Sequence, residues 1–450
     1  MPIKDFITTV LNIGENDIES IKTINNSGKS FDIFLTLKSY RPSCIYCGGP
    51  TKSKGFSRSS ISLPNLSSLQ CTLHWARRRY VCNDCQKSFV EHNRFAPEGL
   101  SASYSLLREI MIDFSNPRMT VTDISKKSHI SVTQLTKYFD SFVNVPVLPL
   151  PESLGIDELH SSMSNRDSAY LCVFVDNENR RLTEILPSRS KRTLSSYFSK
   201  IPLQERKKVR FVTIDMWEPY KSVVSRYLPD AIIAVDPFHV VKTLCDGFTK
   251  LRVEIMKDQL YGSAGYYLLK KWHKLLESDD YDLSMDAERK YNHFFKQKLN
   301  YYDLQQLVLN VSTVLKLAYN LKEMYRDFNR HCRYEDAGSE LNYIMQCFIK
   351  VDLSCYREFV SMVQNWKKEI IASFIRPYDN RKLSNSFSEY TNRRLRELIN
   401  ASNGLNNFVR FRNRAVYCFN KQISYSLSNF LYSNSYKKPE KQGSKQSRKF

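Results

Sequence analysis

The chain has 450 residues, with 67 Lys and Arg against 46 Asp and Glu, a formal net charge of +21 and a pI near 9.4. A protein of that charge attracts polyanions, so nucleic acid is the first partner to consider. The length exceeds what one hydrophobic core organises, and a hydrophobic content of 42% is typical of globular domains. We therefore expect several domains.

Targeting and membrane signals are missing from the sequence. Residues 1–20 mix acids with apolar residues and contain no basic region followed by an apolar run, so they do not form a signal peptide. No apolar stretch reaches the roughly eighteen residues that a membrane span needs. We expect a cytoplasmic protein without a membrane partner, in which the eleven cysteines are thiols or metal ligands rather than disulfides.

Two Cys-x2-Cys pairs, CIYC at 44–47 and CNDC at 82–85, have the spacing of a structural zinc site. Four thiolates complete a closed tetrahedral Zn²⁺ site, and the ligands are Cys44, Cys47, Cys82 and Cys85. The segments FDIFLTL and CTLHWARRRYV are the expected strands of this zinc ribbon. The alternative is two chance pairs of free cysteines.

Three consecutive arginines, Arg77, Arg78 and Arg79, precede Tyr80 in the second of these segments. Arginine side chains bind phosphate oxygens, so we predict that the ribbon touches DNA here. A solvated charged edge is the alternative.

The segment TVTDISKKSHISVTQLTKYFDSF, residues 120–142, has the pattern of two helices joined by a short turn. The second helix is predicted from Ser131, its N-cap, to Phe139. It resembles the recognition helix of a helix-turn-helix, with Gln134 and Lys137 facing a major groove. A helical hairpin with a structural role is the alternative.

A proline-rich linker, VPVLPLPESL, separates these elements from a region of different periodicity. That region shows three strands arranged as hairpins and then alternating strands and helices, which is the element order of an RNase H-like fold. Neither a Gly-x-Gly-x-x-Gly motif nor a P-loop follows any strand. Residues 250–375 have helical spacing throughout and are predicted to be an all-helical insertion.

Two aspartates and one glutamate are the predicted catalytic groups of this fold. Asp157 lies in the first strand, Asp215 ends the fourth strand, and Glu389 lies on a later helix. The two strands are neighbours in an RNase H-like sheet. Three converging acids are best explained by two divalent cations, Mg²⁺ or Mn²⁺, which neutralise them and support in-line phosphoryl transfer.

The chain resembles a bacterial insertion-sequence transposase of the ISL-three type, in which a zinc ribbon and a helix-turn-helix precede a DDE catalytic domain. The motifs that carry the resemblance are RRRYVCNDCQKSF, GIDELH, TIDMWEPYKSVVSRYLPDAIIAVDPFHVVK and SNSFSEYTNRRLRELINASNGLNNFVRFRNR. The resemblance implies DNA strand cleavage and strand transfer by Asp157, Asp215 and Glu389. Family members more often have Asn-Gly before the glutamate, where this chain has residues 385–388 reading NSFS.

The helix that carries Glu389 is rich in cations. Asn385, Glu389, Asn392, Arg393 and Arg396 are spaced three or four residues apart and are predicted to share one helical face. The predicted role of Asn392, Arg393 and Arg396 is to hold DNA phosphates beside the catalytic carboxylate. The alternative is an exposed helix with an intrahelical ion pair between Glu389 and Arg393.

Two acids at strand ends have a structural explanation. Asp236 precedes a proline and is predicted to cap the following helix. Asp176 is predicted to form a turn. His239, near the same end of the sheet as Asp236, is more easily explained as a packing histidine than as a contact to DNA or a group that orients a metal-bound water.

The sequence therefore predicts a DNA transposase that binds the terminal inverted repeats of its element and target DNA, as a homodimer or larger oligomer in the bacterial nucleoid. The alternatives are a zinc-ribbon and helix-turn-helix regulator without catalysis, and an RNase H-like nuclease. The predicted domains are a zinc ribbon (1–100), a helix-turn-helix (101–145), a catalytic core in two parts (146–249 and 376–435), an all-helical insertion (250–375) and a basic disordered tail (436–450).

Overall fold

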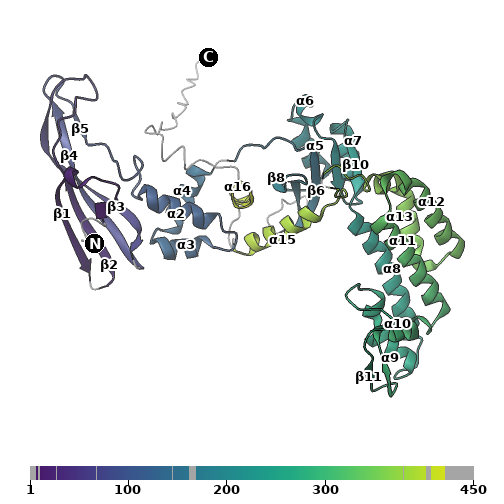
Figure 1. Ribbon diagram of the computed structural model, residues 1–450. Coiled ribbons are helices and arrows are strands. Elements are labelled where there is room, and N and C mark those ends of the chain that lie inside the picture. The colour runs from purple at the N-terminus through teal and green to yellow at the C-terminus, as the bar shows by residue number, and fades with distance from the viewer. Residues whose placement is uncertain are drawn as a thin grey trace, which may run out of the picture. The chain divides into compact units, whose positions relative to one another are not determined.

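The computed structural model describes residues 7–8, 11–26, 28–66, 68–143, 145–161, 169–378, 380–401 and 407–420 (Figure 1). The chain divides into two compact units, one of Met1–Pro146 with Arg394–Phe450 and one of Val147–Arg393. The predicted tail at 436–450 lies outside the described residues. Among the helices of the described ranges, none has the length and apolarity to cross a membrane.

The first unit begins with a five-stranded sheet of order β1-β2-β4-β3, in which β5 pairs with β4. The elements are a 3-10 helix Glu15–Asp17, β1 Ile18–Asn26, β2 Ser30–Leu37, β3 Thr51–Leu66, β4 Leu69–Cys82 and β5 Ser88–Val90. Alternate residues of β4, namely Cys71, Leu73 and Trp75, are buried, as expected for a strand with one face on a core. The strands predicted on either side of the first cysteine pair are confirmed as β2 and β4.

Three helices follow in the same unit: α2 Tyr104–Phe114, α3 Val121–Ser128 and α4 Val132–Phe142. The side chain of Thr120 caps α3, and His129 ends it in the left-handed conformation with φ 56°. Ser131, the predicted N-cap of the second helix, caps α4. The predicted pair of helices with a short turn is confirmed, and α4 ends at Phe142 rather than Phe139.

The second unit is built on a mixed sheet of order β10-β9-β6-β7-β8. The strands are β6 Ser153–His160, β7 Tyr170–Asp176, β8 Arg181–Leu186, β9 Phe211–Ile214 and β10 Ile232–Val235. The first three pair antiparallel, whereas β9 pairs parallel to β6 and β10 parallel to β9. The predicted order of hairpins followed by alternating strands and helices is therefore confirmed.

The two faces of this sheet differ in chemistry. Leu154 and Ile156 of β6 belong to a large apolar cluster, together with Val212 and Ile214 of β9. Ser153 and Asp157 alternate with these apolar residues along β6, so their side chains point to the other face of the sheet. The helices associated with this sheet along the chain are α5 Lys191–Ser199, α6 Leu203–Arg206, α7 Glu218–Tyr227 and α8 Pro237–Lys257.

Residues 250–375 are mainly helical. Their elements are α9 Ala264–Lys271, a 3-10 helix His273–Leu276, β11 Lys290–Asn292, β12 Gln297–Leu299, α10 Tyr301–Leu309, α11 Thr313–His331, α12 Tyr334–Val351, a 3-10 helix Ser354–Tyr356, α13 Arg357–Asn365 and α14 Lys367–Ala372. The prediction of an all-helical block is wrong in one detail, because β11 and β12 form a two-stranded antiparallel hairpin. These strands are too short for their side-chain alternation to stand out in the sequence, and they do not join the central sheet.

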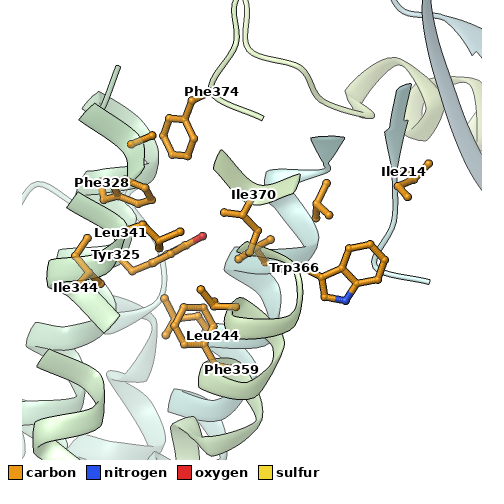
Figure 2. Packing of buried hydrophobic residues seen from close by; sticks show 14 of the residues in the cluster. Ile214, Leu244, Tyr325, Phe328, Leu341, Ile344, Phe359, Trp366, Ile370 and Phe374 are labelled. Carbon is orange, nitrogen blue, oxygen red and sulfur yellow. The ribbon is translucent and has the colours of Figure 1, made fainter. Parts of the chain in front are cut away.

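One hydrophobic cluster joins the sheet to these helices (Figure 2). Ile214 of β9 and Leu244 of α8 belong to the same cluster as Tyr325 of α11, Phe359 of α13 and Ile370 of α14. Helix α8 also runs unbroken through residues 249 and 250, where the predicted domain boundary lies. In the structure the sheet and the helical block therefore share a core.

Helix α15, Ser386–Ala401, carries Glu389, and α16, Phe408–Phe419, follows it. The division between the two units falls inside α15, after Arg393. The arginines of α16 are held within the first unit. The guanidinium of Arg410 donates to both carboxylate oxygens of Asp140 at 2.8 and 2.6 Å, and Arg414 is buried and donates to the Met119 carbonyl.

Two helical glycines provide a test of this packing. A Cβ added at Gly247 of α8 would lie 2.4 Å from the carbonyl oxygen of Cys355, whereas at Gly338 of α12 the nearest atom would be Ile371 Cδ1 at 3.9 Å. We expect Gly247→Ala to lower the free energy of unfolding by about 1 to 3 kcal/mol through overpacking. Gly338→Ala should raise it by about 0.5 to 1 kcal/mol, because alanine loses less entropy in a helix. Thermal melting of the two variants checks this, and equal shifts would contradict it.

Candidate functional site

Parallel pairing places three aspartates at the same level of the central sheet. In the register of β6 with β9, Gly155 is opposite Thr213, which puts Asp157 level with Asp215 two residues further on. In the register of β9 with β10, Ile214 is opposite Val235, which puts Asp215 level with Asp236. Neighbouring strands lie about 4.8 Å apart, so these carboxylates lie side by side on one face of the sheet, with Asp215 between the other two.

Asp215, Asp236 and His239 form a tight group of metal-type ligands. One ligand atom from each lies within 4.8 Å of the others. His239 Nε2 is 3.0 Å from Asp215 Oδ1. Asp236 is 2% exposed and caps α8 through the N–H of Phe238, which confirms the predicted cap. His239 does more than pack, because its ring is paired with a predicted catalytic carboxylate.

Burial and like charge govern protonation at this site. Burial, and then the nearby Asp215 carboxylate, raise the pKa of Asp157 from 3.8 to about 7. Burial raises the pKa of Asp236 to about 6, although its neighbour His239 and the N–H of Asn385 oppose that shift. The hydrogen bond to Asp215 raises the pKa of His239. These are the shifts expected where several acids share a site that a cation could neutralise.

The start of α15 packs on the carboxylate-bearing face of the sheet through polar side chains. The amide nitrogen of Asn392 donates to Asp157 Oδ2 at 2.8 Å, and that of Asn385 donates to the Ile156 carbonyl at 3.1 Å. Ser388 is fully buried, and its Oγ is 3.0 Å from where a Cβ on Gly155 would lie. The same Cβ would lie 2.6 Å from Val175 Cγ2, so a residue larger than glycine at position 155 would crowd β7 as well as α15.

Glu389 lies on the same helix but is exposed. It is one residue beyond Ser388 and one turn before Asn392, so it borders the side of α15 that contacts Asp157. Arg393 and Arg396 are also exposed, as predicted for phosphate contacts. Asn392 is placed differently from the prediction, since it is 4% exposed and its amide holds Asp157.

The four cysteines of the predicted zinc ribbon converge. Their sulfur atoms all lie within 4.8 Å of one another, with Cys44 Sγ 3.6 Å from Cys85 Sγ and Cys47 Sγ 3.5 Å from Cys82 Sγ. Four thiols at this separation fit the tetrahedral ligand set of a structural Zn²⁺ ion.

The three consecutive arginines have three different environments. Arg79 is exposed, as a phosphate contact requires. Arg78 is buried and paired with Glu19, and Arg77 donates to the Glu91 carbonyl and lies 5.5 Å from the Trp75 ring. The expectation that all three face DNA is therefore not supported for Arg78, because its side chain is buried beside a carboxylate partner.

On α4, Lys137 is exposed and Gln134 is half-buried. Leu135, Tyr138 and Phe139 are the residues of α4 that enter the core of the unit. Gln134 and Lys137, the two positions predicted to contact DNA, therefore lie outside the buried face of α4.

Sequence reasoning did not place Asp236 in the carboxylate cluster, and for His239 it preferred a packing role to a role at the site. It explained Asp236 by its capping role alone, although a residue can cap a helix and face a site together. The available signal was topological, since the ends of adjacent parallel strands meet at one edge of a sheet and Asp236 follows β10 as Asp215 follows β9.

Comparison with known proteins shows two family matches. A family model of ISL3 type described as "Transposase" matches residues 154–415, more than half of the chain, and one described as "zinc-finger of transposase IS204/IS1001/IS1096/IS1165" matches residues 41–85. The chain is 25% identical over 233 residues to the transposase for insertion sequence element IS1001 of Bordetella parapertussis, which covers 50% of this chain and 55% of that one. It is 33% identical over 105 residues to the transposase for insertion sequence element IS1557 of Mycobacterium tuberculosis, 23% of this chain and 22% of that one. The matches thus span about half or less of these relatives.

Metal analysis tests the four-cysteine site. We expect one Zn²⁺ per chain in freshly purified protein, lost with the fold of the ribbon on chelation, because structural zinc supplies folding free energy. Cys85→Ser should abolish zinc binding, whereas Cys347→Ala on α12 should retain it. Wild-type protein without zinc would remove this assignment.

The raised pKa of Asp157 predicts how stability depends on pH. Because the folded pKa is about 7 against 3.8 unfolded, folding becomes less favourable as pH rises through this range, and the full cost is present above pH 7. Without divalent metal, Asp157→Asn should therefore melt higher than the wild type at pH 8, and the difference should shrink as pH falls toward 4. An Asp157→Asn variant that melts lower at pH 8 and equally at pH 4 would contradict the assigned burial cost.

Proposed function

Because this chain belongs to the ISL3 family of transposases, we propose that it is a DNA transposase that cleaves the ends of its own insertion sequence and joins them to target DNA. The observation that carries the proposal is the set of level aspartates on the face of the central sheet covered by the start of α15. Transfer of a phosphoryl group needs positioned charge rather than a protein nucleophile. The site offers carboxylates for that purpose.

The proposal includes an RNase H-like core for the second unit. The supporting observation is the strand arrangement, in which an antiparallel meander β6-β7-β8 is extended on the β6 side by parallel β9 and β10. This order places the first and fourth strands next to each other, as the predicted pairing of Asp157 with Asp215 requires. The helices between β10 and α15 would then be the insertion of this core.

The carboxylates fit hard divalent cations. Oxygen ligands are what Mg²⁺ and Mn²⁺ prefer, and Asp236 Oδ2 is buried without a hydrogen-bond partner among the described residues. Asp157, Asp215 and Glu389 would hold these cations, with Asp236 and His239 completing the set around Asp215. Bound divalent cations would stabilise the attacking and leaving oxygens of an in-line displacement.

The protein's own residues then have distinct roles. Asn392 orients the Asp157 carboxylate through its amide, and the backbone N–H of Glu158 holds the other oxygen at 2.7 Å. The exposed guanidinium groups of Arg393 and Arg396 would bind DNA phosphates beside Glu389. Glu389, exposed at the border of the site, would complete the carboxylate set when DNA and metal are bound.

DNA recognition falls to the first unit in this proposal. Arg79 of the zinc ribbon and Lys137 of α4 are exposed cations, and Gln134 lies on the same helix. We assign phosphate contacts to the cations and base reading in the terminal inverted repeats to α4. The proposed setting is the bacterial cytoplasm, where a homodimer or larger oligomer would bring two DNA ends together.

Two other functions are separable by experiment. A regulator with a zinc ribbon and helix-turn-helix would bind the ends without cutting, which leaves the aspartate cluster unexplained. A structure-selective nuclease would cut without joining and would not need the inverted repeats. Cleavage confined to end-containing duplexes, followed by joining, distinguishes the transposase from both.

Substitution of the carboxylates tests the chemistry. We expect Asp157→Asn, Asp215→Asn and Glu389→Gln each to reduce Mg²⁺-dependent cleavage of an end-containing duplex by at least about 10² to 10³, or about 3 to 4 kcal/mol. DNA binding should persist, because removal of a negative charge does not weaken attraction to phosphates. The measurement pairs a cleavage assay with a binding assay on each variant.

Asp230→Asn is the matched control, since Asp230 is exposed and follows α7 in the same unit. It should cleave as the wild type does. Asp236→Asn and His239→Ala should reduce cleavage if these side chains belong to the site. If Glu389→Gln cuts as fast as the wild type, the glutamate is an ordinary surface residue and the third carboxylate lies elsewhere.

A further inference from the structure

A cavity of about 490 Å³ lies in the second unit, and its lining includes none of Asp157, Asp215 and Asp236. The turn between β7 and β8 contributes Asn177 and Arg180, the chain before α15 contributes Tyr378 and Arg381, and α15 itself contributes Phe387 and Tyr390. A cavity of this size is in the range of small-ligand sites. The cavity has no part in the cleavage reaction proposed above.

The lining is cationic and aromatic. Three of its twelve residues are Arg or Lys and, as these twelve are all described, none is Asp or Glu. Arg180 is exposed at the turn, so its guanidinium is accessible to an anion. The rings of Phe387 and Tyr390 are stacked with centroids 6.0 Å apart. A flat, negatively charged ligand fits this combination.

Buried polar atoms in the lining lack partners. Neither the amide oxygen nor the amide nitrogen of Asn177 has a hydrogen-bond partner among the described residues, and both atoms are buried. The Oγ of Ser153, a residue with 0% exposure, is likewise unpaired within the described part of the chain. Buried polar groups are nearly always hydrogen-bonded, so these atoms have room for partners that the described chain does not supply. An amide whose N–H donor and carbonyl acceptor are both unpaired can form two hydrogen bonds with the edge of a nucleobase.

We propose that this cavity receives one unpaired nucleotide of the bound DNA, a proposal that rests on the function proposed above. Asn177 reads the edge of the base, Phe387 and Tyr390 provide the apolar and aromatic wall, and Arg180 pairs with the phosphate. A nucleotide is the ligand class that combines an aromatic ring, a hydrogen-bonding edge and a phosphate. Extrusion of a base from a duplex costs free energy, which such contacts offset.

The position of the cavity fits DNA rather than a free nucleotide. Ser153 and Asp157 lie on the same face of β6, four residues apart, which is about 13 Å at about 3.3 Å per residue. That is about four steps of a B-form duplex at about 3.4 Å per step. A nucleotide a few positions from the cleaved phosphate would therefore reach the cavity.

A fluorescence scan tests the proposal on the full-length protein. End-containing duplexes carry 2-aminopurine at single positions within six nucleotides of the cleavage site on either strand. We expect the wild type to raise the fluorescence several-fold at one position, because the probe is unstacked there. Asn177→Ala and Arg180→Ala should lose this increase, and Arg192→Ala, an exposed arginine on α5, should retain it.

A second measurement uses a duplex that lacks the base at the position where the fluorescence rises. Asn177→Ala should bind the intact duplex several-fold more weakly than the wild type and the abasic duplex equally well, since no base remains to be read. An equal deficit on both duplexes overturns the proposal, because the effect would then be structural.

The two proposals fail differently. Asp157→Asn should not cleave but should still raise the fluorescence, because Asp157 does not line the cavity. Wild-type cleavage without a fluorescence increase at any position overturns the nucleotide pocket alone. A fluorescence increase without wild-type cleavage overturns the catalytic assignment alone.

Discussion

Like charges held at one level by parallel strand pairing are the constraint around which the second unit is organised. Hydrogen-bonded pairing of β6 with β9 and of β9 with β10 leaves Asp157, Asp215 and Asp236 no freedom to separate along the strands. Their repulsion and burial make the metal-free site costly, which is the physical meaning of a pKa of about 7 for Asp157. In the proposed function, this local cost to stability is offset when the site binds divalent cations.

The apolar face of the same sheet supplies the opposing stability. It shares a cluster with α8 and the helices up to α14, so the helical block contributes to holding the strands in register (Figure 2). The other face is covered by the polar start of α15. Asn385, Ser388 and Asn392 are buried there, and the oxygens of these side chains lack hydrogen-bond partners among the described residues. Polar packing of this kind holds a helix through a few directional hydrogen bonds. Small changes at the site can therefore shift the position of α15, which carries Glu389.

The arginines show why the number of charges in a sequence does not locate a DNA-binding surface. Arg78 pairs with Glu19 in the sheet of the first unit, Arg410 pairs with Asp140, and Arg414 is buried against backbone carbonyls. These cations are bonded within the first unit. The field that attracts DNA depends on those left exposed, such as Arg79 and Lys137.

The sequence by itself determined what depends on local pattern: the two cysteine pairs, the strand and helix periods, the caps at Ser131 and Asp236, and the motifs around Asp157, Asp215 and Glu389. Spacing and alternation are properties of neighbours along the chain, and they survive without knowledge of the fold. Tertiary structure decided which acids share a site, that Asn392 holds Asp157, that Arg78 is buried, and that β11 and β12 pair. Those outcomes depend on strand register and on partners more than two hundred residues apart, such as Asn392 and Asp157, and local pattern carries no information about either.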